Sequence, residues 1–405
     1  MSARSTAFGR GRILVLAALV AGVVAVSGCT AGGPSAGPSA TSSAATPSAA
    51  RDRGAFPVLS PEARIRLYAA SRLQSMTLEQ KIASMFVVHI PGSDPAPVQG
   101  YLAANGAAGV LLLGDNVPGS TQQTAAFTAA LQTGDGLGTV IAIDEEGGIV
   151  ARLSADTFPA AETLKNEPAA ATADAFRQRA ALVRQAGANV NFGVIADTTA
   201  DPGSFIYDRV LGTDPATASE RVAAAVTAEN GQVLSTLKHF PGHGQVPGDS
   251  HDSLPSTDIS MEQWSTSDEP PFQAGIDAGA PLVMFGHLVY TAVDSAPASL
   301  SPAWHALLRE RLGFEGVAVT DDLLMLEASG VPAYADRTTN AVAAVAAGND
   351  LLLYNSTVDL PPLVASIANA VRSGEIAESA VDEAVLRDLV LRRGIWLQQH
   401  PDAAL

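Results

Sequence analysis

Eight short apolar runs, separated by segments with helical periodicity, fill the sequence from residue 85 onward. Continuous apolar strands that alternate with helices are typical of a parallel sheet covered by helices, because both faces of such a sheet are buried. Eight such units in about 340 residues predict an α/β fold with one (β/α)₈ barrel, as in the TIM barrel. A doubly wound open sheet is the alternative, since periodicity does not show closure. The runs are Met85–Ile90, Gly109–Gly114, Thr139–Asp144, Asn189–Asp197, Val233–Phe240, Ala280–Tyr290, Gly316–Asp321 and Asp350–Tyr354.

The segments between the runs predict the covering helices. An N-terminal stretch, Pro61–Ser84, has helical periodicity, and Thr77 with Gln80 three residues later is typical of a helix cap. The other helices are expected at Thr121–Gln132, Ala173–Ala186, Ala218–Gly231, Met261–Ala278, Pro302–Leu312, Thr338–Ala347, Pro361–Arg372 and Ser379–Gln398.

Polar residues follow several of the predicted strands. The third run ends at Asp144, the fourth at Asp197 and the seventh at Asp321–Asp322, while the sixth carries His287. A single Asp after a strand is often a helix N-cap. Active sites of (β/α)₈ barrels lie at the C-terminal ends of the strands, so several such residues in register favour a site there.

The segment after the fifth run has the highest density of titratable groups. Lys238–Gly244 reads Lys-His-Phe-Pro-Gly-His-Gly, and Asp249–His251 reads Asp-Ser-His. Its prolines and glycines prevent a helix, so it is a loop at a strand end, where scaffolds commonly carry chemistry. A solvated polar loop is the plain alternative.

Carboxylates at separate strand ends, together with a His held by an Asp, suit cleavage of a glycosidic bond. Asp321 is the candidate nucleophile, and its neighbour Asp322 is expected to point elsewhere or to cap the next helix. His251 is the candidate proton shuttle, because histidine titrates near neutral pH. Asp249 is expected to fold back and orient the imidazole of His251.

The same loop resembles a known family. Lys238–Gly244 followed by Asp249–His251 is similar to the signature of the β-N-acetylglucosaminidase branch of glycoside hydrolase family 3, which includes peptidoglycan-recycling enzymes. The resemblance covers most of residues 77–353. Three further blocks match in order: 143–148 with Arg152, Asp208–Arg209 with Asp214–Pro215, and 313–323.

This resemblance implies a retaining mechanism without a cofactor or metal, with Asp321 as nucleophile and Asp249–His251 as the acid/base pair. Glu145 stands where Gln is common and Ile149 where Arg is common, so fine specificity is open. The residues that it implies for binding the N-acetylated sugar are Asp144, Arg152, Arg209, Lys238 and His239.

The resemblance also distinguishes branches of the family. Many of its β-glucosidases add a second α/β domain that contributes the acid/base, whereas this chain ends soon after the eighth run. We therefore expect a barrel without a C-terminal α/β sandwich, and an exo-β-N-acetylglucosaminidase acting on cell-wall fragments. A β-glucosidase and an N-acetylglucosamine phosphorylase of the same family are the alternatives.

Two rivals come from other classes. A metal hydrolase would use His239, His243, Asp249 and His251 as ligands, but Pro and Gly between the first two preclude the helical spacing of zinc peptidases. A non-catalytic lipoprotein that only binds glycan would not need the nucleophile and the acid/base pair together.

The N-terminus predicts export. Residues 1–29 have a basic start and an uncharged stretch at Ile13–Val26, about fourteen residues, where a membrane span needs about twenty. Cys29 follows Val-Ser-Gly and resembles the cysteine of a bacterial lipobox, which implies a lipid anchor on the outer face of the cell membrane; cleavage and secretion is the alternative. Residues 30–55, rich in Ala, Ser, Pro and Gly, predict a disordered tether, and 56–399 the catalytic barrel.

Composition limits the partners. A net charge of −17 argues against binding to nucleic acid and against electrostatic adhesion to anionic lipid. A single cysteine excludes an intrachain disulfide. We expect a monomer whose partner is a carbohydrate and whose only membrane contact is the anchor.

Overall fold

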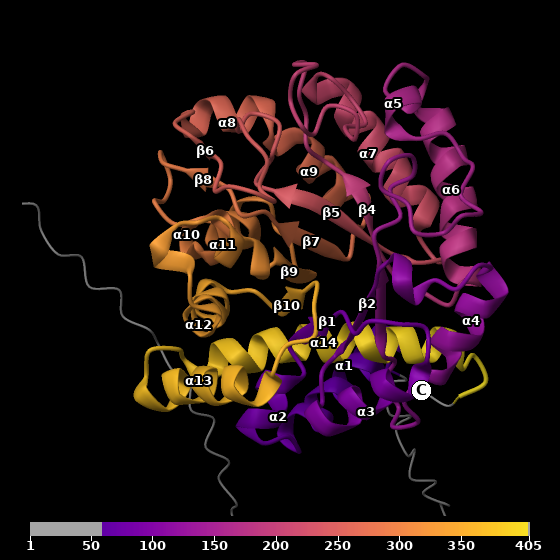
Figure 1. Cartoon of the computed structure of the whole chain (residues 1–405), viewed down its shortest axis with the longest axis vertical. Helices are drawn as coiled ribbons and strands as arrows, with labels where there is room; N and C mark the ends of the chain where they lie inside the picture. Colours follow the sequence, from indigo (N-terminus) through magenta and orange to yellow (C-terminus); the bar gives the residue numbers. More distant parts are fainter. Residues whose placement is uncertain (1–58, 404–405) are drawn as a thin grey trace, which may run out of the picture. The chain divides into compact units, whose positions relative to one another are not determined.

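The computed structural model describes residues 59–403, which fold around a closed barrel of eight parallel strands (Figure 1). The order around the barrel is β1-β10-β9-β7-β5-β4-β3-β2, and Phe86 of the first strand pairs with Leu352 of the last. This closure confirms the predicted barrel over the open sheet. The barrel strands are β1 (Phe86–Val88), β2 (Gly109–Leu112), β3 (Val140–Ile143), β4 (Val190–Ile195), β5 (Leu234–Phe240), β7 (Leu282–Phe285), β9 (Val317–Asp322) and β10 (Leu351–Tyr354).

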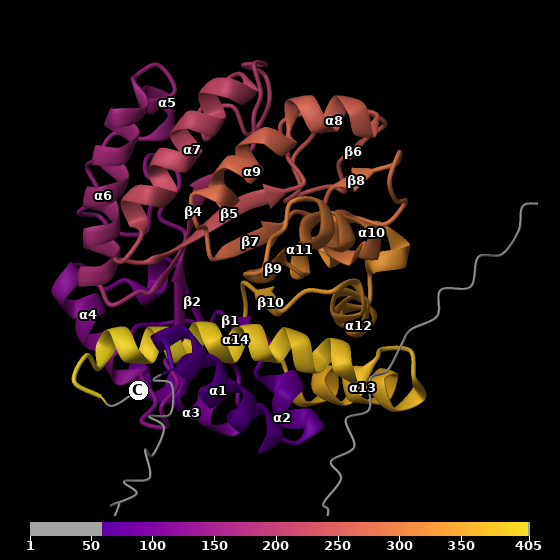
Figure 2. The same ribbon diagram turned by 180° about the vertical axis from the view of Figure 1, so that it is seen from behind.

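A main helix follows each barrel strand, and α6, α7 and α9 pack side by side on the outside of the barrel (Figures 1 and 2). These helices are α3 (Pro95–Asn105), α4 (Thr121–Ala130), α6 (Ala169–Gln185), α7 (Pro215–Glu229), α9 (Glu269–Asp277), α10 (Pro302–Ala306), α12 (Arg337–Ala347) and α13 (Leu360–Ser373). The others are α1 (Pro61–Gln74), α2 (Leu78–Ala83), α5 (Ala161–Leu164), α8 (Met261–Ser267), α11 (Leu324–Ala328) and α14 (Glu378–Gln399).

Local sequence signals set several helix ends. Thr77 and Gln80 form the predicted capping box at the start of α2. Asp214 caps α7 by accepting hydrogen bonds from the backbone N–H groups of its first turn, and Pro215 occupies the first helical position. Gly348 ends α12 with a φ of 116°, a conformation that glycine adopts without the steric cost of a side chain.

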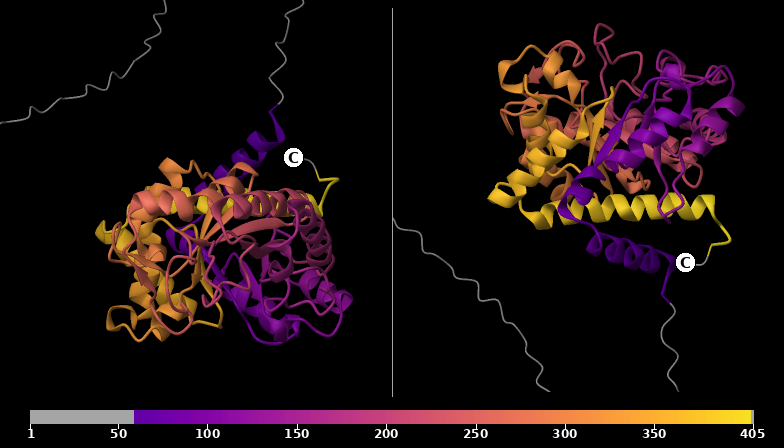
Figure 3. Two further views of the ribbon diagram at one scale, coloured as in Figure 1. Left: turned by 90° about the horizontal axis from the view of Figure 1, so that it is seen from above. Right: turned by 60° about the horizontal axis from the view of Figure 1, so that its bottom comes forward.

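Apolar side chains fill the inside of the barrel. Alternate residues of the strands, such as Val140 and Ala142 of β3 and Phe192 of β4, form one cluster that Ile395 of α14 joins. A Cβ added to Gly138, just before β3, would lie 2.4 Å from the side chain of Ile395. Helix α14 therefore closes the end of the barrel at which the strands begin, and α1 packs beside it (Figure 3).

The predicted run Ala280–Tyr290 is wrong as a single strand. The chain leaves the barrel after β7 at Gly286, whose N–H donates to the carbonyl of Phe240 at 2.9 Å. It then forms a short strand, β8 (Val289–Tyr290), which pairs with β6 (Ser256–Thr257) outside the barrel. Most residues of this run are apolar or small, so hydrophobicity did not show where the strand ends.

Two predicted helices also differ from the structure. Met261–Ala278 is divided into α8 and α9, because Pro270 and Pro271 lack backbone N–H groups and cannot continue α8. Pro302–Leu312 begins as α10 and finishes in a π-helical turn at Leu307–Arg311.

The predicted signal segment 1–29, its Cys29 and the predicted tether 30–55 lie outside the described residues. The limits predicted for the barrel domain, 56–399, stay a prediction. Within residues 59–403, no helix combines the length and the apolar character needed to cross a membrane.

Asp350 joins several elements at the end of the barrel where the strands begin. Its carboxylate is buried and accepts hydrogen bonds from Arg309 at 2.7 Å, from Arg387 of α14 at 2.8 Å and from the backbone N–H of Ala318 in β9 at 2.7 Å. Removing one partner of a buried ion pair is costly, because the remaining charges lose their compensation.

We predict that Asp350→Ala lowers the free energy of unfolding by about 3 kcal/mol. Glu383→Ala is the control, because Glu383 pairs with the same Arg387 at 3.7 Å but is exposed, and it should cost less than about 0.5 kcal/mol. Urea unfolding followed by circular dichroism measures both. Equal losses in the two variants would contradict this account.

Candidate active site

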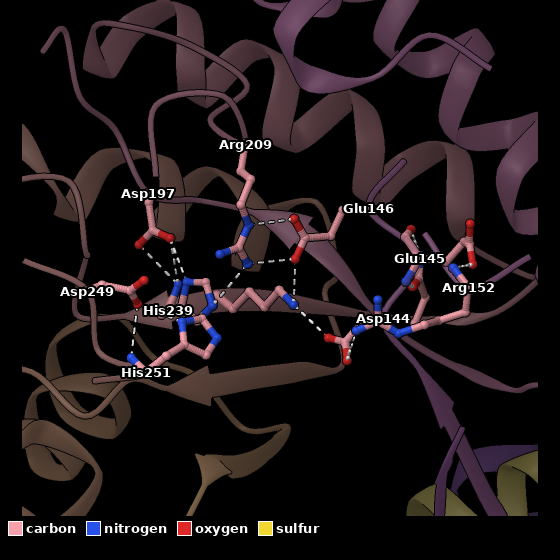
Figure 4. A network of polar contacts seen from close by, with 11 residues as sticks. Asp144, Glu145, Glu146, Arg152, Asp197, Arg209, His239, Asp249 and His251 are labelled. Atoms are coloured by element: carbon pink, nitrogen blue, oxygen red, sulfur yellow. Dashed lines mark hydrogen bonds and ion pairs between the residues drawn. The ribbon is translucent and has the colours of Figure 1, made fainter. Parts of the chain in front are cut away.

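The polar residues predicted at the strand ends do lie at one end of the barrel. Asp144 follows β3 and Asp197 follows β4. Lys238 and His239 are among the last three residues of β5, and Asp321 is the residue before the last of β9. Hydrogen bonds and ion pairs join the groups on β3, β4 and β5 into one network (Figure 4). The closed parallel barrel brings them together because all its strands end on the same side.

Two cations share one buried carboxylate at the centre of this network. The Nζ of Lys238 lies 2.7 Å from Glu146 and 2.8 Å from Asp144. Arg209 donates two hydrogen bonds to Glu146, at 2.9 and 2.7 Å, in the bidentate geometry that suits guanidinium and carboxylate. Arg152 lies 3.6 Å from the second oxygen of Asp144. The structure thus brings Asp144, Arg152, Arg209 and Lys238 together, as predicted.

The charges in this network are mutually stabilised. Burial alone would raise the pKa of Glu146, but the charges and hydrogen bonds of Lys238 and Arg209 outweigh it and lower this pKa to about 2. Burial would lower the pKa of Lys238, yet Asp144 and Glu146 raise it above its ordinary value. Lys238 and Glu146 are therefore both charged at neutral pH.

Asp197 holds the loop after β5. Its carboxylate accepts hydrogen bonds from Nδ1 of His239 at 2.7 Å and from the backbone N–H groups of His239 and His243, the latter at 2.6 Å. Against the opposing effect of burial, the two histidines lower the pKa of Asp197. Because Nδ1 of His239 donates to this carboxylate, its Nε2 is left facing Arg209, 3.4 Å away.

Adjacent aspartates of β9 have different environments. Burial would raise the pKa of Asp321, but His239, His287, the N–H of Asp322 and Lys238 lower it, so this carboxylate is ionised. Asp322 turns the other way and accepts hydrogen bonds from the N–H groups of Leu324 and Asn355, both at 3.1 Å. Asp322 therefore points elsewhere, which was one of the two expectations for it, and burial raises its pKa to about 6.

His287 is a buried histidine with both nitrogens satisfied. Its Nε2 lies 2.8 Å from the carbonyl oxygen of Asp322, and its Nδ1 lies 2.7 Å from the hydroxyl of Ser299. Since a carbonyl only accepts, Nε2 carries the hydrogen and Nδ1 accepts from Ser299. Burial lowers the pKa of His287, which keeps it neutral. It thus fixes the peptide next to Asp321.

The Asp249–His251 pair forms as predicted. Nδ1 of His251 donates to Asp249 at 2.6 Å, and the backbone N–H of His251 donates to the same oxygen at 2.9 Å. Burial would raise the pKa of Asp249, but these two hydrogen bonds lower it. The side chain of His251 is 61% exposed, so its Nε2 can reach a bound molecule.

An aromatic residue connects this exposed loop to the buried network. The ring of Phe205 lies 4.5 Å from that of His243 and 5.9 Å from that of His251, with the guanidinium of Arg209 5.8 Å away on the ring face. His243 is buried, and its Nε2 lies 3.2 Å from the hydroxyl of Ser250. His243 is therefore held inside the loop and is not presented to solvent.

Four residues of the site received no role from the sequence: Glu146, Asp197, Phe205 and His287. Asp197 had a signal, because it ends the fourth predicted run, and His287 had one as a titratable residue within the sixth. Glu146 belongs to the block at 143–148, but its contacts with Lys238 and Arg209 join residues far apart in the sequence. Phe205 gave no signal. Among the described residues, no group of three His, Cys, Asp or Glu is arranged to hold a metal ion.

Comparison with known proteins identifies the class. Residues 77–391 match the family model described as the glycosyl hydrolase family 3 N terminal domain. A curated protein of Mycobacterium tuberculosis, β-hexosaminidase LpqI, is 32% identical over 352 residues, which cover 82% of this chain and 87% of that protein.

Solved structures agree with this match. The structure of Mycobacterium tuberculosis LpqI has a TM-score of 0.72 at 29% identity and covers 80% of this chain and 96% of that one. A glycoside hydrolase family 3 β-N-acetylglucosaminidase from Paenibacillus sp. str. FPU-7 has a TM-score of 0.73 at 30% identity, covering 82% of this chain but only 64% of that longer chain. The chain belongs to glycoside hydrolase family 3, and it is a glycoside hydrolase that acts on carbohydrate.

We predict that Glu146→Gln lowers the free energy of unfolding by about 3 kcal/mol at pH 7. This is the free energy that corresponds to the lowering of the pKa of Glu146 from 4.5 to about 2. A lowered folded-state pKa stabilises the fold above pH 4.5, and this contribution is lost as the pH falls toward 2. The difference between wild type and variant should therefore shrink over that range, as measured by chemical unfolding.

Glu378→Gln is the control for this test. Glu378 pairs with Lys81 at 3.5 Å but is 60% exposed, so its replacement should have little effect on stability at any pH. A Glu146→Gln variant as stable as the wild type at pH 7 would show that the buried network contributes no net electrostatic stabilisation.

Proposed function

We propose that this enzyme is a retaining exo-β-N-acetylglucosaminidase, which releases terminal β-linked N-acetylglucosamine through a covalent glycosyl-Asp321 intermediate. The observation that carries the proposal is an ionised Asp321 at the end of β9, combined with an exposed His251 that Asp249 orients on the loop after β5. The names of LpqI and of the Paenibacillus enzyme support the sugar assignment.

In the first step, a carboxylate oxygen of Asp321 attacks the anomeric carbon and the bond to the leaving oxygen breaks. His251 donates its Nε2 proton to that oxygen, so the aglycone leaves as a neutral alcohol. Asp249, hydrogen-bonded to Nδ1, holds the ring in place and balances the charge of the imidazolium.

In the second step, the neutral His251 takes a proton from water, and the water oxygen attacks the anomeric carbon. The bond from the sugar to Asp321 breaks, which restores the carboxylate and releases the free sugar. The lowered pKa of Asp321 makes this carboxylate a good leaving group.

Sugar recognition falls to the buried network. Toward the sugar, Lys238, Arg209 and Arg152 would donate hydrogen bonds and Asp144 would accept them. The contacts of these four groups with one another and with Glu146 hold them in place before substrate arrives. Rigid, paired groups of this kind bind a hydroxyl-rich ligand without the entropy cost of ordering long side chains. His239, fixed by Asp197, is proposed as the fifth binding group.

The sequence supports a cell-surface location. We infer that Cys29 is lipidated and that residues 30–55 tether the barrel to the outer face of the membrane, where fragments of peptidoglycan would be the substrate. The enzyme would act there as a monomer, with the lipid as its only membrane contact.

Substrate choice is tested with a chain that begins at residue 51. We predict faster initial rates on 4-nitrophenyl N-acetyl-β-glucosaminide than on 4-nitrophenyl β-glucoside, with no acceleration by phosphate. Faster cleavage of the glucoside would overturn the sugar assignment. A rate that rises with phosphate and a sugar phosphate product would replace hydrolysis by phosphorolysis.

Residue roles are tested by Asp321→Asn and His251→Ala. We predict that the first lowers kcat at least about a thousandfold, because an amide cannot form the glycosyl ester. The second should lower kcat by about 10²–10⁴ on substrates with poor leaving groups, because it removes the proposed proton donor to the leaving oxygen. Ser253→Ala, on the same loop, is the control, and an equal loss in it would indicate general damage to the loop.

Lipidation is tested in cells that make the full chain. We predict that the wild-type protein incorporates a labelled fatty acid and partitions into detergent, and that Cys29→Ala does neither. Incorporation of label into the Cys29→Ala variant would place the lipid elsewhere, and a wild-type protein free in the medium would indicate secretion.

A further inference from the structure

A buried cluster of acidic residues lies directly behind the proposed sugar-binding groups. Glu145 is fully buried between Asp144 and Glu146, which both face the network of the site. Its Oε2 accepts hydrogen bonds from the backbone N–H groups of Arg152 at 2.9 Å and Leu153 at 3.0 Å (Figure 4). Glu145 thereby joins the start of the loop 144–153 to its end, where the side chain of Arg152 points toward Asp144.

The backbone of Glu145 is fixed as well. Asn191 of β4 accepts from its N–H and donates to its carbonyl oxygen, both at 3.1 Å. Nearby, a Cβ added to Gly147 would lie 2.1 Å from the guanidinium of Arg179, so the turn is packed tightly onto that side chain. The position of this loop therefore depends on the contacts of Glu145 and on the packing of Gly147 against Arg179.

The charges around Glu145 do not balance if it is ionised. Asp156 and Arg179 form a fully buried ion pair, with 2.5 Å between Nε and the carboxylate, so the charge of Arg179 is already compensated. Within residues 59–403, the other oxygen of Glu145, Oε1, is buried without a hydrogen-bond partner, and the carboxylate of Asp156 neighbours that of Glu145. On α7, the buried Glu229 accepts from Asn191 at 2.8 Å and adds a second acidic group.

We propose that Glu145 is a positioning residue that acts in its neutral form: Oε2 holds the Arg152–Leu153 backbone, and a proton on Oε1 is directed at Asp156. An ionised Glu145 would place two carboxylates side by side away from water, which is strongly unfavourable. The loop, and with it the side chain of Arg152, would then move away from the sugar-binding position.

The surroundings of Glu145 favour the protonated form of its carboxyl group. Burial, opposed by the two backbone hydrogen bonds and reinforced by Asp156, raises the pKa of Glu145 from 4.5 to about 8. Because the folded-state pKa of Glu145 is raised, the contribution of Glu145 to stability is greatest below pH 4.5 and is lost as the pH rises toward 8. Burial also raises the pKa of Glu229, to about 7, so this group needs its own control.

The first test is binding. The inference rests on the proposed function, since it assigns Arg152 to the sugar. For the wild type, we expect the dissociation constant of N-acetylglucosamine and the KM of its 4-nitrophenyl β-glycoside to rise about tenfold between pH 7 and pH 9.5. The value of kcat is measured separately, because it also depends on the reacting groups Asp321 and His251. Glu145→Gln, whose amide copies the neutral carboxyl, should lose this rise, and Glu229→Gln should keep it. Retention of the rise in Glu145→Gln, or its loss in Glu229→Gln, would overturn the proposal.

The second test does not depend on substrate. The melting temperature of Glu145→Gln should match the wild type near pH 4.5 and exceed it at pH 8, because only the wild type must keep a proton on folding. Equal melting temperatures at both pH values would show that Glu145 is ionised in the folded protein. If the wild type neither binds nor cleaves the N-acetylated sugar, the proposed function fails, while this thermal comparison still decides the protonation of Glu145.

Discussion

The pairing of Lys238 and Arg209 with one buried carboxylate, Glu146, is the interaction on which the site depends. Each cation would be strongly destabilised alone in this position, because burial removes its hydration. Glu146, with help from Asp144, compensates both and remains ionised. The site can therefore keep several hydrogen-bond donors out of bulk water and ready for a polar ligand, and the closed barrel supplies the rigid frame that holds them.

Charge at the same end of the barrel also differentiates neighbouring groups. Asp321 faces His239, His287 and Lys238 and is ionised, while Asp322 points away from them and has a raised pKa. The same contrast separates Glu146, whose pKa is lowered by Lys238 and Arg209, from Glu145, one residue earlier, whose pKa is raised by burial and by Asp156. Neighbouring carboxylates thus differ in pKa because their side chains have different surroundings.

Much of the fold could be predicted from the sequence, because the barrel strands are short apolar runs and their order is the chain order. Closure could not, since it depends on pairing between Phe86 and Leu352, which are far apart in sequence. The site residues at strand ends and the contact of Asp249 with His251 were also predictable. The partners of His239 and Lys238 were not, because each partner lies on another element and is brought near only by the barrel.

The central claim is that Asp321 becomes covalently attached to the sugar. The most direct measurement is mass spectrometry of the enzyme after incubation with a 5-fluoro N-acetylglucosaminyl fluoride, which reacts with a nucleophile but is released slowly. The account predicts that the mass of one fluorinated sugar is added and lies on the peptide that contains Asp321. Turnover without any adduct, or an adduct on another carboxylate, would contradict it.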